Sequence, residues 1–158
     1  MREKTFTLDE ARSLLPKVRG MLTQANMELE SFVDRLEEAN VQHLQIESRM
    51  AQLKTDEPPN SEHMELRDCR TKFQESIQRL SQIQQEYVQC MTMWVDALGD
   101  MGIMLRDLQS GLLDFPAEKG KFEYLLCWRL ADSDIEFWHL PNDGFRGRRP
   151  LAVLDEYF

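Results

Sequence analysis

The fold is decided by residues 7–54, which read TLDEARSLLPKVRGMLTQANMELESFVDRLEEANVQHLQIESRMAQLK. The first four residues have the form of a capping box, in which the Thr7 hydroxyl and the Glu10 carboxylate each accept the other residue's backbone amide. Apolar residues then recur at alternating steps of three and four, with only His43 interrupting them. This 3.5-residue period is typical of a coiled-coil seam. The pattern predicts one helix over residues 7–54, with a kink or a restart near Pro16.

A second helix with the same period follows a short breaker. Residues 55–61, TDEPPNS, end the first stripe, and a second stripe begins at Leu66. We predict helix two over residues 61–98, ended by Gly99 and Gly102. Two matching seams joined by a short turn favour an antiparallel, coiled-coil-like helical hairpin. Because such a hairpin buries little surface alone, we expect self-association through the helices, as a four-helix homodimer.

The last third of the chain has the pattern of a small antiparallel sheet. Residues 103–107 and 112–115 are predicted as short strands, the second closed by Pro116. A β-hairpin follows, with strands around a turn at residues 131–134. The predicted register places five pairs opposite one another: Leu130 and Ile135, Arg129 and Glu136, Trp128 and Phe137, Cys127 and Trp138, and Leu126 and His139. The fold class is therefore α+β: one domain over residues 1–158, with the sheet and a C-terminal Arg/Gly loop spanning 103–151.

Composition narrows the classes of function. The chain has 28 Asp and Glu against 19 Lys and Arg, a formal net charge of -9, so this acidic protein is unlikely to bind nucleic acid. Three separated cysteines without CxxC spacing argue against disulfides and zinc knuckles and favour the cytoplasm. No apolar run is long enough for a membrane span, so no membrane partner is expected.

Polar residues that suit a binding site gather near the end of the predicted sheet. His139 closes the β-hairpin, Asp143 lies in a Pro-Asn-Asp-Gly turn, and residues 144–150, GFRGRRP, carry three arginines and no acid. Arginine forks suit carboxylate or phosphate, so Arg148 and Arg129 are candidate anion ligands. Ordinary structural roles are equally open: a cross-strand ion pair for Arg129, a hydrogen-bonded core-edge position for His139, and a solvated loop.

Sequence motifs identify no reaction. The chain has no GxSxG, GxxxxGK[ST] or GxGxxG motif. His43 and His63 do not form a required metal pair, whereas His139 with Asp143, helped by Asp114 or Glu136, is a weak oxygen and nitrogen metal set. Cys127 is expected to be packed, with no base beside it. We therefore predict no catalytic residues, no metal ligands and no cofactor.

Eight short segments spread along nearly the whole chain form a recognisable pattern: Phe6–Ala11, Leu14–Pro16, Gly111–Pro116, Leu126–Arg129, Trp138–His139, Gly144–Phe145, Gly147–Arg148 and Pro150–Leu151. By these segments, in this order, the chain resembles a bacterial and archaeal family, domain of unknown function 2203. The family pattern often has Leu-Gly-Glu after Cys-Trp-Arg, where this chain has Leu130-Ala-Asp132. The resemblance implies no established activity, but it adds a set of candidate ligand-binding residues within or beside the pattern: Asp114, Arg129, His139, Asp143 and Arg148.

Three functional hypotheses follow. The first is a non-enzymatic, homo-oligomeric protein that binds a ligand or partner, with a small anion-accepting pocket where the sheet meets the loop at 144–150. The second is a small enzyme, with or without a metal ion, that uses His139 with Asp143 or Asp114. The third is a coiled-coil scaffold whose tip, around residues 56–61, binds a partner. Whether the protein is an enzyme stays open, and the composition and motifs favour the first hypothesis.

Overall fold

The computed structural model describes residues 4–56 and 64–157. It contains two long helices, α1 (Leu8–Asp56) and α2 (Met64–Asp100), followed by a five-stranded sheet. The chain forms two compact units, Met1–Met27 with Met91–Phe158, and Glu28–Cys90. Among the described residues, no helix is both long enough and apolar enough to cross a membrane.

Helix α1 begins at the predicted capping box. The amide of Glu10 donates to Thr7 Oγ1 at 3.1 Å, and the amide of Thr7 donates to Glu10 Oε1 at 3.4 Å. These bonds satisfy two of the backbone donors that the first turn of a helix leaves without partners. The helix continues without interruption through Pro16, so the expectation of a restarted helix there is wrong. Proline removes only one hydrogen bond, and the helix continues beyond it.

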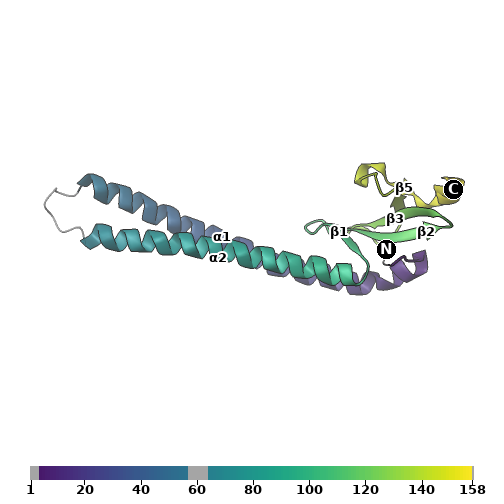
Figure 1. Ribbon diagram of the computed structural model, residues 1–158, viewed down its shortest axis with the longest axis horizontal. Helices are drawn as coiled ribbons and strands as arrows, with labels where there is room; N and C mark the ends of the chain where they lie inside the picture. The colour runs from purple at the N-terminus through teal and green to yellow at the C-terminus, as the bar shows by residue number, and fades with distance from the viewer. Residues whose placement is uncertain (1–3, 57–63, 158) are drawn as a thin grey trace. The chain divides into compact units, whose positions relative to one another are not determined.

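The unit Glu28–Cys90 is the predicted antiparallel helical hairpin (Figure 1). Phe32 of α1 meets Tyr87 of α2 edge to face, with ring centroids 6.5 Å apart. Where His43 interrupts the apolar stripe, its Nδ1 lies 2.7 Å from Ser76 Oγ and its ring stacks on Phe73. The polar pair is thus satisfied inside the seam. The buried apolar residues of this unit follow the predicted period: Leu29, Ala39, Leu53, Leu66, Cys69 and Ile83.

The predicted breaker extends beyond the described part of the chain. Residues 57–61 and His63 lie outside it. The described residues therefore leave out most of the tip around residues 56–61, where the scaffold hypothesis places the binding of a partner. Helix α2 then begins at Met64 and ends at Asp100, so it includes Gly99. Gly102 follows with φ of +87°, a conformation that glycine adopts readily.

The sheet is antiparallel, as predicted, and its strands follow one another in chain order. Two 3-10 turns and a final short helix accompany the last strand. The elements after α2 are β1 (Met104–Asp107), β2 (Leu112–Lys119), β3 (Phe122–Trp128), β4 (Phe137–His139), η1 (Phe145–Gly147), β5 (Arg149–Pro150), η2 (Leu151–Val153) and α3 (Leu154–Tyr157).

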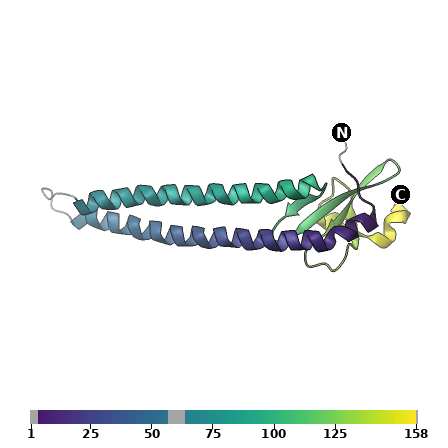
Figure 2. The same ribbon diagram turned by 90° about the horizontal axis from the view of Figure 1, so that it is seen from below.

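One face of the sheet packs on the first turns of α1, drawn in purple (Figure 2). Phe6, just before the helix, meets Phe115 of β2 with ring centroids 5.4 Å apart. The Arg19 guanidinium lies over the Trp128 ring at 5.2 Å and donates to the Leu130 carbonyl at 2.9 Å. The fully buried core residues of this unit include Val18, Leu22, Leu113, Phe115, Leu126, Trp128 and Trp138. This packing leaves the opposite face of the sheet to form a site.

Strand β2 does not end at Pro116 as predicted but runs on to Lys119. Strand β1 pairs with β2 only as far as Asp114, so Pro116 has a strand neighbour on one side only, where it pairs with Leu125. A proline is tolerated at such a position because no ladder bond to a second strand is lost. Its carbonyl accepts the Phe6 amide at 2.7 Å.

The predicted β-hairpin register is wrong by one residue. The observed pairs are Leu125 with His139, Leu126 with Trp138, and Cys127 with Phe137. Strand β3 ends at Trp128 because a compact turn follows, in which the Arg129 amide donates to Asp132 Oδ2 and the Asp132 amide donates to the Arg129 carbonyl. Arg129 therefore pairs with Asp132 at 3.5 Å, in place of the predicted pair with Glu136. A one-residue slip moves every side chain of one strand to the other face.

Candidate functional site

A row of polar side chains crosses the face of the sheet opposite α1. Arg106 comes from β1, Asp114 from β2, Cys127 from β3 and His139 from β4. Asp114 and Cys127 are direct cross-strand partners, and the observed register brings His139 to the same face. Relative exposure is 1% for Asp114, 1% for Cys127 and 3% for His139. Ionisable groups buried to this degree need specific partners.

Both ring nitrogens of His139 face hydrogen-bond acceptors. Nδ1 lies 2.9 Å from the Leu140 carbonyl oxygen, and Nε2 lies 2.8 Å from Asp114 Oδ1. Both nitrogens therefore donate, and the ring is an imidazolium. The hydrogen bond to Asp114, followed by one to Cys127, raises the pKa of His139 to about 10, although burial acts in the opposite direction. Without a bound metal, this histidine stays charged at neutral pH.

Asp114 is shared by two cations. Its Oδ1 accepts from His139, and its Oδ2 accepts from Nε of Arg106 at 2.8 Å. A buried carboxylate is stable only when its lone pairs are satisfied and its charge is balanced. The two bonds fix both oxygens of Asp114 in place.

The same three buried residues have the composition of a metal site. Asp114, Cys127 and His139 each offer one ligand atom, and the three atoms lie within 4.8 Å of one another. A thiolate, an imidazole and a carboxylate are all ligands that zinc and related transition metals accept. Because Nδ1 of His139 is held by the Leu140 carbonyl, Nε2 is the nitrogen available to a metal. A backbone carbonyl on the other ring nitrogen is the usual outer partner of a metal-bound histidine.

A cavity of about 340 Å³ opens onto this cluster. Its other wall is formed by the loop that follows β4. Asp143 lies on that wall, partly buried, and the loop folds tightly over it, because a Cβ added to Gly147 would lie 2.8 Å from Asp143 Cβ. The lining residues are Arg106, Leu112, Asp114, Cys127, His139, Pro141, Asn142, Asp143, Gly144 and Phe145.

The structure brings together three of the five candidate ligand-binding residues. Asp114, His139 and Asp143 all line this cavity. The two arginines do not line it and instead contact the ring of Phe145: Arg148 at 4.1 Å and Arg129 at 5.4 Å from its centroid. Arg148 also lies 4.1 Å from the centroid of Phe137, so its guanidinium is held between two rings.

Sequence reasoning missed two members of the site. Cys127 was expected to be packed, and it is buried, but its place beside His139, with a ring nitrogen within 4.8 Å of its sulfur, was not foreseen. Arg106 was not singled out at all. The side chains of both residues can be placed on the same face of the sheet as Asp114 only when the strand register is known. The alternation pattern in the sequence is therefore too weak a signal to identify them.

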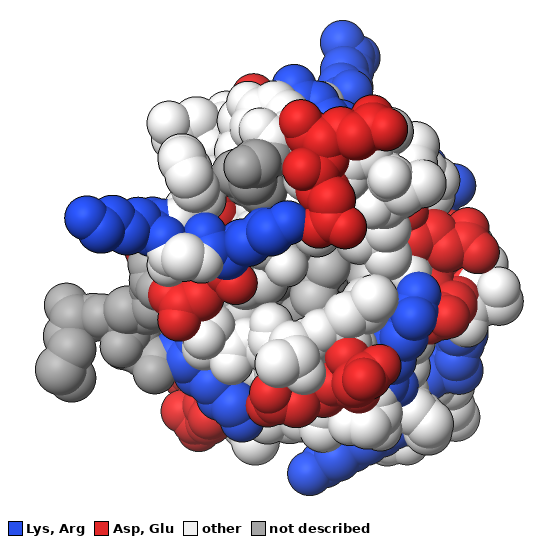
Figure 3. Space-filling model, turned by 90° about the vertical axis from the view of Figure 1, so that its right-hand side faces the viewer, with Lys and Arg blue, Asp and Glu red and all other residues white. Residues whose placement is uncertain are grey.

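The charges of the described residues on one face of the protein are mixed. Figure 3 shows acidic and basic side chains side by side over this face. The binding of a nucleic-acid backbone relies on Lys and Arg gathered over one surface. The described residues on this face do not form such a surface.

Comparison with known proteins places the chain in a family. A family model described as "Uncharacterized conserved protein (DUF2203)" matches residues 4–151, which include every strand of the sheet and all the residues of the cluster. No curated protein and no solved structure matches the chain. By the extent of that one match, the chain belongs to the DUF2203 family.

Proposed function

We propose that this protein is a metal-dependent hydrolytic enzyme that binds one divalent transition metal ion, such as zinc, through Asp114, Cys127 and His139. The observation that carries this proposal is the meeting of three buried ligand atoms of different types within 4.8 Å. The outer partners of a metal site are also present, because the Leu140 carbonyl holds His139 and Arg106 holds the second oxygen of Asp114.

Charge balance supports a divalent ion in this position. A thiolate from Cys127, a carboxylate from Asp114 and a neutral His139 together neutralise a charge of two. Zinc must displace two protons, one from His139 Nε2 and one from the Cys127 thiol. With a pKa of about 10, the first costs about 4 kcal/mol at pH 7. Structural zinc sites with four ligands bind with roughly 10–16 kcal/mol, so protons compete with the metal without excluding it, and the affinity for metal rises with pH.

The number of ligands favours catalysis over a structural role. Structural zinc sites have four protein ligands, whereas catalytic sites have three and leave one position open. Here the open position would face the 340 Å³ cavity. When bound, a metal held in this way would act as a Lewis acid and would lower the pKa of a bound water to about 7. Asp143 lines the same cavity and its carboxylate has no partner among the described residues, so it would be the general base of this site.

Metal analysis of the untagged protein tests the proposal. We expect about one equivalent of zinc after loading and desalting, and loss of that metal in Cys127→Ser and His139→Gln. Cys69→Ser is the matched control, because Cys69 is also buried but lies in the helical hairpin. Cobalt-loaded protein should show a thiolate charge-transfer absorption that disappears in Cys127→Ser and persists in Cys69→Ser. Folded wild-type protein that retains no metal, or retains it equally in Cys127→Ser, would overturn the proposal.

A second candidate function is non-enzymatic anion binding at the Arg/Gly loop. The observation that favours it is Nη1 of Arg148, which is buried and has no hydrogen-bond partner among the described residues. An anion would satisfy this donor. Sulfate or phosphate should then raise the melting temperature, and Arg148→Ala should remove the gain while Arg146→Ala, at an exposed neighbour, should not.

Self-association through the helices is also part of the proposed function. Several apolar side chains of the hairpin are exposed, including Val41 and Leu44 of α1, each with 54% relative exposure. They border a shallow groove with Gln45, Ser48, Arg49 and Gln52. Contact with a second copy would remove this apolar surface from water.

A further inference from the structure

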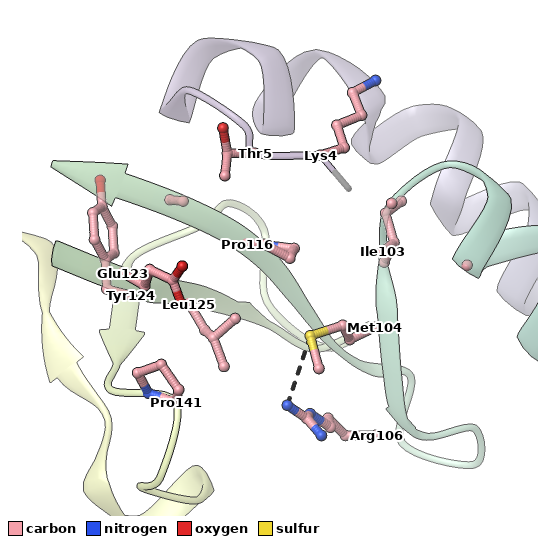
Figure 4. A pocket seen from close by; sticks show the side chains of 13 residues that line it. Lys4, Thr5, Ile103, Met104, Arg106, Pro116, Glu123, Tyr124, Leu125 and Pro141 are labelled. Carbon is pink, nitrogen blue, oxygen red and sulfur yellow. Dashed lines mark hydrogen bonds between the residues drawn. The ribbon is translucent and has the colours of Figure 1, made fainter. Parts of the chain in front are cut away.

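A second and larger cavity, of about 590 Å³, lies beside the cluster on the same face of the sheet. Figure 4 shows Leu125 and Pro141 opposite Met104 and Arg106 across this space. Most of its wall is apolar, with the main contributions from Ile103, Met104, Pro116, Ala117, Leu125 and Pro141. Its volume falls in the range of small-ligand pockets, roughly 300–1,000 Å³.

The two cavities adjoin at Arg106 and Pro141, which line both of them. The guanidinium of Arg106 is fixed at this junction, because its Nε donates to Asp114 Oδ2 and its Nη2 lies 3.8 Å from Met104 Sδ. Its Nη1 has no hydrogen-bond partner among the described residues, and the relative exposure of the side chain is 41%. The guanidinium of Arg106 is therefore held in place between the larger, mostly apolar cavity and the proposed metal position.

We propose that the ligand of this cleft is a small hydrophobic carboxylate, with its carboxylate on Arg106 and its hydrocarbon part in the larger cavity. A carboxylate with a hydrocarbon part has no bond to hydrolyse and corresponds to the acid product of a hydrolytic metal centre, and in that role this assignment rests on the function proposed above. A single guanidinium matches one negative charge, and arginine forks fit carboxylate geometry. Glu123 on the wall of the larger cavity and Asp143 in the smaller one disfavour a ligand with more negative charge.

Lys4 is the second cation on the wall of the larger cavity. Its ammonium lies over the Phe6 ring, 4.9 Å from the centroid, and it does not line the smaller cavity. Arg106 does line both, so a carboxylate bound to it would lie at the junction of the two cavities, beside the proposed metal position. The orientation of the ligand is therefore a testable part of the inference.

Calorimetric titration of metal-free protein with octanoate tests the ligand class. We expect one saturable site for octanoate and weaker binding, by at least tenfold, for acetate and for 1-octanol. Arg106→Gln should reduce octanoate affinity at least tenfold, and Lys4→Met should change it less than threefold. Loss of binding in Lys4→Met with retention in Arg106→Gln would overturn the orientation. No saturable binding of octanoate to folded wild-type protein would overturn the proposal as a whole.

Substitutions that fill the larger cavity provide a second, independent test of the ligand class. Met104→Trp places a larger side chain in the cavity from the partly exposed edge strand β1, and Pro141→Trp does so from the loop. Both should weaken octanoate binding, whereas Met93→Trp, at an exposed site on α2 that does not line the cavity, should not. Unchanged affinity in both folded cavity variants would contradict the proposal.

Metal content and octanoate binding are measured separately on the same folded wild-type protein, with octanoate titrated after removal of metal by EDTA. The two results therefore test the two proposals independently. If the protein binds octanoate but no metal, only the proposed hydrolytic function is overturned. If it binds metal but no octanoate, only the proposed ligand class is overturned.

Discussion

His139 Nε2 lies 2.8 Å from Asp114 Oδ1, and the relative exposures of the two side chains are 4% and 2%. In metal-free protein this is an ion pair between an imidazolium and a carboxylate. Its partners are Arg106 on one side and the Leu140 carbonyl on the other. The pair thus joins β1, β2 and β4 on this face of the sheet, and its own two side chains are shielded from water.

This pair makes the stability of metal-free protein depend on pH. The pKa of His139 is raised from 6.5 in the unfolded chain to about 10 in the folded protein. The stabilisation is therefore fully present below pH 6.5 and is lost as pH rises toward 10, with a total of roughly 5 kcal/mol. Urea unfolding in the presence of EDTA at pH 6, 8 and 10 measures this loss.

Asp114→Asn keeps the shape of the side chain and removes its charge, so it should shift the titration of His139 downward and flatten the pH dependence above pH 7. It should also destabilise the protein by about 3–5 kcal/mol at pH 6, because a buried cation loses its partner. Glu136→Gln, at an exposed position on the segment just before β4, is the control and should leave the pH profile unchanged. A profile that is the same in Asp114→Asn and wild type would show that the pair does not control the titration.

Alanine substitutions at two glycines distinguish the cost of backbone strain from the cost of steric overlap. Gly111 and Gly120 have φ of +68° and +63°, and a Cβ on Gly111 would lie 2.7 Å from Leu130 Cβ, whereas one on Gly120 would meet nothing within 4 Å. Gly120→Ala should cost about 1–2 kcal/mol from the left-handed conformation alone. Gly111→Ala should cost a further ~1–3 kcal/mol from overlap in a packed region. Equal losses in chemical denaturation would contradict the close approach of Gly111 to the turn after β3.

The proposed self-association predicts a specific mass. Light scattering at micromolar concentration should give twice the mass of the chain for wild-type protein. A double substitution, Val41→Glu with Leu44→Glu, should give the monomer mass, because it places charges on the apolar patch of α1. Gln42→Glu, an exposed neighbour on the same helix, is the control. A monomer for wild type, or a dimer that survives the double substitution, would argue against this interface.

The sequence alone determined the helices and the class of the fold. The capping box at Thr7 and the 3.5-residue stripe are local patterns, and a helix with a continuous apolar seam has few alternatives to packing on a second such helix. The polar break at His43 was also visible, but its partner, Ser76, was not identified from the sequence. The alternation of residues 122–130 correctly indicated a strand, although it did not show where that strand ends.

Tertiary structure alone decided the register, and with it the site. The side-chain period of a strand is two, so the apolar pattern fits two registers that differ by one residue, and only contacts distant in sequence select between them. Here the turn at Arg129 and Asp132, and the donation of the Leu130 amide to the Ser110 carbonyl, end β3 at Trp128. That selection turns His139 away from the α1 side and toward Asp114 and Cys127, because the sheet buries its large aromatic side chains on the face that α1 covers.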